Sequence, residues 1–164
     1  MFDIIIRGGT VLDGTGAPGR RADVGVTGDR ITALGDLSDA DARQTIEAGG
    51  MVVAPGFIDM HSHGDFHLPF RPTADSKIHQ GITTEVVGNC GSSIAPLSAD
   101  MQAEMNRSYR KEGSEKTVDW LSFREFVERL QRIGTSVNAA LLVGHGAVRE
   151  KVMGMSDAEP TPEE

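Results

Sequence analysis

The residues of this chain best suited to chemistry are two histidines in a short apolar segment. His61 and His63 stand two positions apart at the end of the run that begins at Phe57. Side chains alternate between the two faces of a β-strand, so in a strand both imidazoles would point the same way. They could then hold one metal ion, and we interpret the pair as half of a metal site.

A cysteine and a third histidine follow two other strand-like runs. Cys90 comes after the β-branched run Ile82–Val87, and His145 comes after the apolar run Ser136–Val143. Imidazole and thiolate together favour zinc over magnesium or calcium, and zinc lowers the pKa of a bound water to about 7, which permits hydrolysis at neutral pH. The sequence therefore predicts a zinc site with Cys90 as a ligand. We interpret His145 as a pocket residue beside the substrate, with a hydrogen bond to the barrel rim as the alternative role.

Each of these side chains also has a plainer interpretation. His61 and His63 could be core histidines with satisfied hydrogen bonds, and Cys90 could be a small buried hydrophobe, the commonest fate of a free cysteine. His67, in a loop, and His79, near a helix end, are interpreted as residues that do not bind the metal.

Two acidic residues near the expected ligands need partners if they are buried. Asp59 has the parity of His61, so it should point to the same side as that ligand and is interpreted as structural or as a support for it. Glu85 has the opposite parity to Cys90, so it should face the helix layer, and the sequence does not name its partner.

The first third of the chain predicts a small all-β module over residues 1–55. Short apolar runs alternate there with Gly and Asp, which is typical of strands and turns. Thr27–Asp29 lies between two of these runs and indicates a hairpin. The predicted strands are Phe2–Arg7, Thr10–Leu12, Ala22–Val26, Arg30–Leu34, Gln44–Ala48 and Met51–Ala54.

The sequence pattern changes in residues 56–164, where apolar runs typical of strands alternate with runs typical of helices. Thr73–Gln80 predicts a short helix, and Ser122 with Glu125 forms a capping box for a helix that runs to Gly134. Asp100–Lys116 is rich in Met and in charged residues, and we interpret it as an irregular helix or excursion. This alternation predicts an α/β fold whose parallel sheet is covered on both faces.

Composition narrows the choice of partners. The chain has 16 Lys and Arg against 24 Asp and Glu, a net charge of −8, so nucleic acid and anionic membranes are not expected partners. A single cysteine cannot form an intrachain disulfide, and no long apolar stretch near Met1 indicates a signal peptide or membrane span. We expect a cytoplasmic protein.

Several segments together resemble the amidohydrolase superfamily, and within it the N-acyl-D-amino-acid deacylases, or D-aminoacylases. The histidine pair alone is typical of the superfamily, whereas a cysteine after the second barrel strand is specific to this branch. Most relatives instead bridge their metals with a carboxylated lysine. The matching segments are Gly8–Gly14, Ala54–His63, Gln80–Thr84, Gly88–Gly91 and Val143–Gly146.

The resemblance implies a TIM barrel flanked by a small β-sandwich, and zinc-dependent hydrolysis of an N-acyl-D-amino acid to a D-amino acid and a carboxylate. It implies one or two zinc ions, with His61 and His63 at the weaker site and Cys90 bridging to, or holding, the tighter one. The general-base aspartate and two further histidines belong to family segments beyond residue 164. No catalytic residue is therefore assigned within these residues.

Length supports the expectation of a truncated barrel. A complete (β/α)₈ barrel takes about 250 residues, and only about 108 follow the β module. Thr161–Glu164 has the form of a helix start, although a charged disordered tail from Ser156 is the plainer interpretation. The alternative functions are a non-catalytic barrel fragment, or a cyclic-amide hydrolase of the dihydroorotase or dihydropyrimidinase kind, which Cys90 disfavours.

Overall fold

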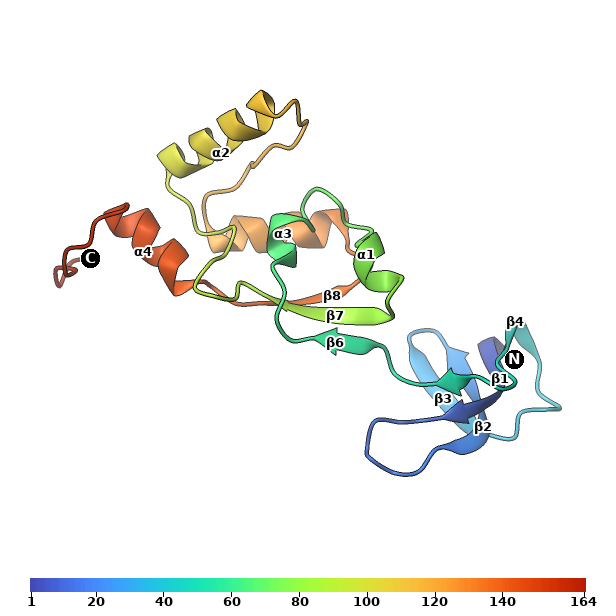
Figure 1. Ribbon diagram of the computed structural model, residues 1–164. Helices are drawn as coiled ribbons and strands as arrows, with labels where there is room; N and C mark the ends of the chain where they lie inside the picture. Colours follow the sequence, from blue (N-terminus) through green and yellow to red (C-terminus); the bar gives the residue numbers. More distant parts are fainter. The chain divides into compact units, whose positions relative to one another are not determined.

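The computed structural model describes all residues from Met1 to Glu164. The chain forms two compact units, Met1–Pro55 and Gly56–Glu164 (Figure 1). The first unit contains only strands, and the second alternates strands with helices.

The first unit is a five-stranded sheet with the strand order β3-β2-β1-β4, in which β5 also pairs with β1. The expected hairpin is confirmed, because β2 and β3 are antiparallel with Thr27 opposite Arg30. Within residues 1–55 the strands form a single sheet. Its strands are β1 (Phe2–Val11), β2 (Arg20–Thr27), β3 (Arg30–Gly35), β4 (Ala42–Glu47) and β5 (Val52–Val53).

The two runs expected as the first and second strands form one strand, β1, interrupted by a bulge. Its register with β2 shifts between Ile6 and Gly9, and Gly8 has a φ of 73°, which favours glycine. The bulge separates two pairing partners, because β4 pairs with the first half of β1 and β5 pairs with its end.

The second unit is built on a three-stranded parallel sheet with the order β6-β7-β8. The α/β prediction is confirmed. A membrane-spanning helix would need a longer and more hydrophobic segment than any helix found here. The elements of this unit are β6 (Phe57–Asp59), η1 (Gly64–Phe66), α1 (Asp75–Ile78), β7 (Ile82–Val87), α2 (Ala99–Lys111), α3 (Phe123–Ile133), β8 (Asn138–Leu141) and α4 (His145–Met153).

Only one face of this sheet is covered by helices, so the prediction of two covered faces is wrong for these residues. Figure 1 shows α1 and α3 on the same side of the sheet. The connection from β6 to β7 and the connection from β7 to β8 step in the same direction across the sheet. Right-handed crossovers that step in the same direction place their helices on the same face of the sheet. Ile58 of β6 is left 60% exposed.

The core of the second unit lies between α3 and the covered face of the sheet. Trp120 is 1% exposed, and its indole N–H donates to the Ile94 carbonyl at 3.2 Å. Phe126 of α3 packs beside it, and Ala139 and Leu141 of β8 close the cluster from the sheet. This packing fixes the strand order that positions the site described below.

Helix α2 corrects the interpretation of residues 100–116 as irregular. Ser98 caps it, accepting the Met101 N–H at 3.2 Å. Met101, Met105 and Tyr109 pack against the core at a spacing of four residues. The sequence did not indicate this regular helix, because the row of core-facing side chains is only one residue wide and its neighbours are polar or charged.

The capping box at the start of α3 is confirmed, and it gives a first test of the fold. Ser122 Oγ accepts the Glu125 N–H at 3.2 Å, while Glu125 Oε2 accepts the Ser122 N–H at 2.7 Å. We expect Ser122→Ala to lower the free energy of unfolding by about 1 kcal/mol, because the Glu125 N–H in the first turn of α3 loses its side-chain acceptor. Urea denaturation measures this. Ser136→Ala, at an exposed serine whose side chain makes no hydrogen bond, should leave stability unchanged.

Candidate metal centre

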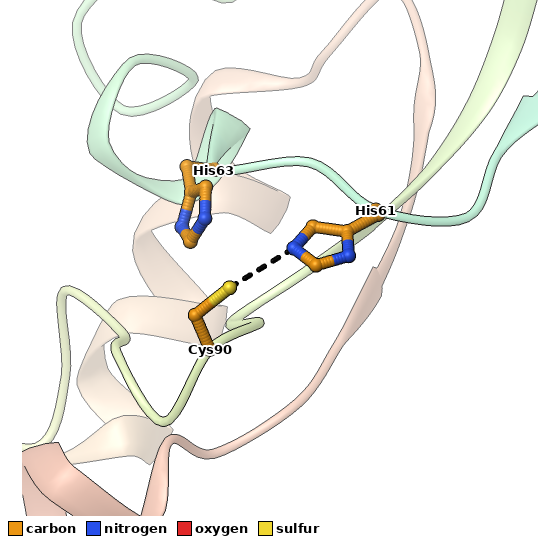
Figure 2. Close-up of side chains that lie close together, drawn as sticks. All are labelled: His61, His63 and Cys90. Carbon is orange, nitrogen blue, oxygen red and sulfur yellow. Dashed lines mark hydrogen bonds between the residues drawn. The ribbon is translucent and has the colours of Figure 1, made fainter.

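Three side chains that could hold a metal ion converge just beyond two neighbouring strands. His61 and His63 follow β6 and Cys90 follows β7, and their candidate ligand atoms all lie within 4.8 Å of one another. His61 Nε2 and Cys90 Sγ are 3.0 Å apart, and the two imidazole rings stand edge to face with centroids 5.8 Å apart (Figure 2). The structure therefore brings the three predicted ligands together.

The reason for the convergence differs from the expected one. Strand β6 ends at Asp59, so neither histidine lies on a strand, and the alternation that we predicted does not operate there. The two imidazoles face the same space because the loop between them is tied to β7. Ser62 donates its N–H to the Val86 carbonyl at 2.9 Å.

Asn89 completes this attachment. Its Nδ2 donates to the Ser62 carbonyl at 3.1 Å and to the Val86 carbonyl at 2.8 Å. Both peptide groups of Ser62 are thereby bonded to the strand end that carries Cys90. Sequence reasoning missed Ser62 and Asn89, whose positions between and beside the predicted ligands were only a weak signal.

The backbone at Cys90 has an unusual conformation. Its φ is 56°, and it stands between Gly88 and Gly91, whose φ values are 84° and 71°. A non-glycine residue in the left-handed region costs about 1–2 kcal/mol. A Cβ at Gly88 would collide with the Leu142 carbonyl, so glycine is needed there. This tight turn directs the thiol toward His61.

Three charged side chains, Lys77, Asp59 and Glu85, form an ion-paired group next to the candidate ligands. Lys77 Nζ of α1 is 2.6 Å from Asp59 Oδ2 and 3.5 Å from Glu85 Oε2. The hydrogen bond from Lys77 lowers the pKa of Asp59, helped by the His61 N–H. Burial disfavours the ammonium of Lys77, but the two carboxylates outweigh it and raise the lysine pKa.

This group supplies the partners that both acidic residues needed. The prediction that Asp59 and Glu85 point to opposite sides is wrong, since they are register partners on adjacent strands and share one ammonium. The parity argument failed because it counted from His61, which lies outside the strand.

Asp65 is a buried acid that the sequence did not single out. It is 1% exposed, and its Oδ2 accepts the Ile94 N–H at 2.9 Å, while Oδ1 has no hydrogen-bond partner. Burial raises the pKa of this carboxyl. It fastens the loop after β6 to the loop after β7, and so contributes to the same framework.

The remaining histidines lie outside the three-residue group. His145 is the exposed first residue of α4, and its role beside the substrate stays a prediction. His67 is exposed in the turn after η1, and His79 bonds through Nδ1 to the Asp75 carbonyl at 2.8 Å.

The hollows of the second unit do not enclose the three donors. One of about 1000 Å³ lies between α2, α4 and the loop after β7, and none of the three donors lines it. A second, of about 610 Å³, is lined by His63, Lys77 and Glu85. All three donor residues are exposed, so within these residues the group stands open to solvent.

The donor set suits zinc. Two imidazole nitrogens and a thiolate sulfur bind zinc at about 2.0–2.3 Å, which places neighbouring donors about 3.3–3.6 Å apart in tetrahedral geometry. Atoms already within 4.8 Å reach that spacing by small side-chain rotations. Three protein donors are fewer than the four of a closed tetrahedral zinc site, so further ligands or water would complete the coordination.

Comparison with known proteins gives matches over nearly the whole chain. The amidohydrolase family pattern matches residues 44–164. A D-aminoacylase of Alcaligenes xylosoxydans xylosoxydans is 46% identical over 99% of this chain and 33% of its own length. The chain thus spans about a third of the length of the relatives it matches.

Solved structures agree. A D-aminoacylase crystal structure superposes with a TM-score of 0.84 at 44% identity, over 99% of this chain and 34% of that one. The N-acyl-D-glutamate deacylase of Bordetella bronchiseptica, complexed with zinc and a phosphonate inhibitor, gives 0.85 at 40% identity, over 99% and 33%. The predicted resemblance is confirmed: this chain belongs to the amidohydrolase family and is related within it to the D-aminoacylases.

Proposed function

We propose that this chain is the metal-binding N-terminal part of a zinc-dependent hydrolase that cleaves the linear amide of N-acyl-D-amino acids. The products would be a D-amino acid and a carboxylate. The observation that carries the proposal is the convergence of His61, His63 and Cys90 beyond adjacent parallel strands. Similarity to D-aminoacylases supports the substrate class.

Each of the three residues would have a distinct part. His61 and His63 would bind through neutral imidazoles at the weaker site, and Cys90 would act as a thiolate that bridges to, or holds, the tighter one. One or two zinc ions would be held, and a related D-aminoacylase has a binuclear centre. Zinc so bound would polarise the amide carbonyl and activate water for attack.

The proton transfers require a general base, and the two acids that share Lys77 are poorly suited to that role. Asp59 is occupied by Lys77 and Glu85 by Lys77 and Ser62, so neither is free to accept a proton from water. We place the general base, and further metal ligands, in residues beyond 164 of a longer protein. His145 is retained as a residue beside the substrate.

The fold of that longer protein would be a (β/α)₈ barrel. Strands β6, β7 and β8 would be its first three, with their uncovered face turned to the barrel interior. Exposed apolar side chains at Ile58, Leu142 and Val143 support continuation of the sheet. Residues 1–55 would form one layer of the flanking β-sandwich.

Metal analysis combined with an amide-hydrolysis assay tests this function. We expect the purified chain to retain zinc after dialysis but not to hydrolyse N-acetyl-D-amino acids, because the proposal places the general base beyond residue 164. A protein in which the coding sequence continues past Glu164 should hydrolyse the D substrates and spare their L enantiomers. Absence of zinc from the purified chain, or preference of the longer protein for L substrates, would contradict the proposal.

A further inference from the structure

A buried hydrogen-bond chain connects the segment between the two histidines to the ammonium of α1. Ser62 Oγ donates to Glu85 Oε2 at 2.5 Å, and it accepts the Gly64 N–H at 3.1 Å. Ser62 is 5% exposed and Glu85 is 1% exposed. Glu85 in turn faces Lys77 Nζ at 3.5 Å.

Burial of the Glu85 carboxylate is energetically unfavourable, so its presence in the sheet needs a functional explanation. It lies in the middle of β7, among the β-branched residues Thr83, Thr84 and Val86, where an aliphatic side chain would fill the same space. A buried carboxylate destabilises a protein unless it is paired and hydrogen-bonded. The hydrolysis proposed above uses neither its charge nor its protons.

The contacts of Ser62 show what Glu85 controls. With its N–H on Val86, its carbonyl on Asn89 and its hydroxyl on Glu85, Ser62 has all three of its polar groups fixed to β7 or to the turn after it. Its chain neighbours are His61 and His63. Rotation of this residue would therefore move both imidazoles relative to Cys90.

Gly64 shows how closely the loop is fitted to this carboxylate. A Cβ at Gly64 would collide with both carboxylate oxygens of Glu85. The glycine lets the backbone after His63 approach Glu85, so the segment 61–64 is held from the side as well as through Ser62.

We propose that Ser62 and Glu85, neutralised by Lys77, are positioning residues that set the separation of His61 and His63 from Cys90 for metal binding. This inference rests on the proposed function, since it presumes that the three donors bind zinc. Groups that hold metal ligands in place typically contribute about 10–100-fold to metal affinity. A network that only stabilises the sheet would change the stability of the metal-free protein and leave the affinity of the folded protein unchanged.

Zinc affinity of the folded chain tests the inference. We expect Ser62→Ala and Glu85→Ala each to weaken zinc binding by about 10–100-fold in competition with a chromophoric chelator. Glu85→Gln keeps an acceptor for the Ser62 hydroxyl and should recover most of the affinity. The double variant Ser62→Ala/Glu85→Ala should bind little worse than either single variant, since both remove the same bond.

Matched controls separate positioning from general damage. Ser136→Ala and Glu128→Ala change exposed residues of the same unit whose side chains make no hydrogen bond, and should bind zinc as the unaltered chain does. Each titration is made at a temperature at which circular dichroism shows the metal-free variant folded. If Glu85→Ala does not fold without metal, Ser62→Ala decides, because it removes one oxygen and leaves the ion pair intact.

The outcomes are distinct. Tight zinc binding by the unaltered chain together with equally tight binding by folded Ser62→Ala and Glu85→Ala would overturn the positioning role and leave the proposed function standing. Failure of the unaltered chain to bind zinc would overturn the proposed function, and this inference with it.

Discussion

Replacing Cys90 by serine is expected to weaken zinc binding by more than about 100-fold. Even groups that merely hold metal ligands contribute about 10–100-fold, and this change removes a ligand itself. A hydroxyl oxygen is a harder donor than a thiolate and is not ionised at neutral pH, so serine does not restore the site. Zinc dissociation constants measured by chelator competition give the comparison.

Cys90→Gly provides the matched variant. It should lose zinc to the same extent, but in the metal-free state it should be more stable than the unaltered chain by about 1 kcal/mol, because glycine adopts a φ of 56° without strain. Opposite changes in zinc affinity and metal-free stability would show that the strained turn is maintained for its thiol. A Cys90→Ser variant that retains full affinity would remove the cysteine from the site.

Replacing Lys77 by methionine is expected to lower the free energy of unfolding by about 3–5 kcal/mol. Lys77 is the only cation within ion-pair distance of Asp59 and of Glu85, whose side chain is 1% exposed. Removing one partner of a buried pair leaves an uncompensated charge, which is why the cost is large. Methionine retains most of the aliphatic stem, so lost packing contributes little.

The pH dependence of this effect identifies its cause. Lys77 lowers the pKa of Asp59, so the stabilisation that Asp59 provides is present above its ordinary pKa of 3.8 and is lost as the pH falls through its lower folded value. The stability difference between the two proteins should therefore shrink in acid. Urea denaturation at neutral and acidic pH measures it, with the exposed Lys111→Met as control. An equal loss of stability at both pH values would argue against the ion pair.

The sequence predicted which side chains converge more securely than it predicted the geometry that brings them together. Apolar runs beginning at Phe57 and Ile82 identified two neighbouring parallel strands, and parallel strands deliver the residues at their carboxyl ends to one edge of a sheet. That topological argument was sufficient for His61, His63 and Cys90. The two-residue alternation was not needed, since β6 is too short to include either histidine.

What the sequence could not supply are the contacts between elements distant in the chain. Glu85 could be recognised as an acid that needs a partner, but its partner Lys77 lies on a helix whose placement depends on the packed fold. Ser62 carried a weak signal, because a small polar residue between two ligands has many uses. The capping box at Ser122, by contrast, is a local pattern, and it was predictable for that reason.

X-ray absorption at the zinc edge tests the central claim most directly, because it reports the atoms around the metal without reference to activity. For the zinc-loaded chain we expect a sulfur at about 2.3 Å and nitrogens at about 2.0–2.1 Å, and we expect the sulfur signal to vanish in Cys90→Ser. A coordination shell of oxygen and nitrogen alone in the unaltered chain would contradict a centre formed by His61, His63 and Cys90.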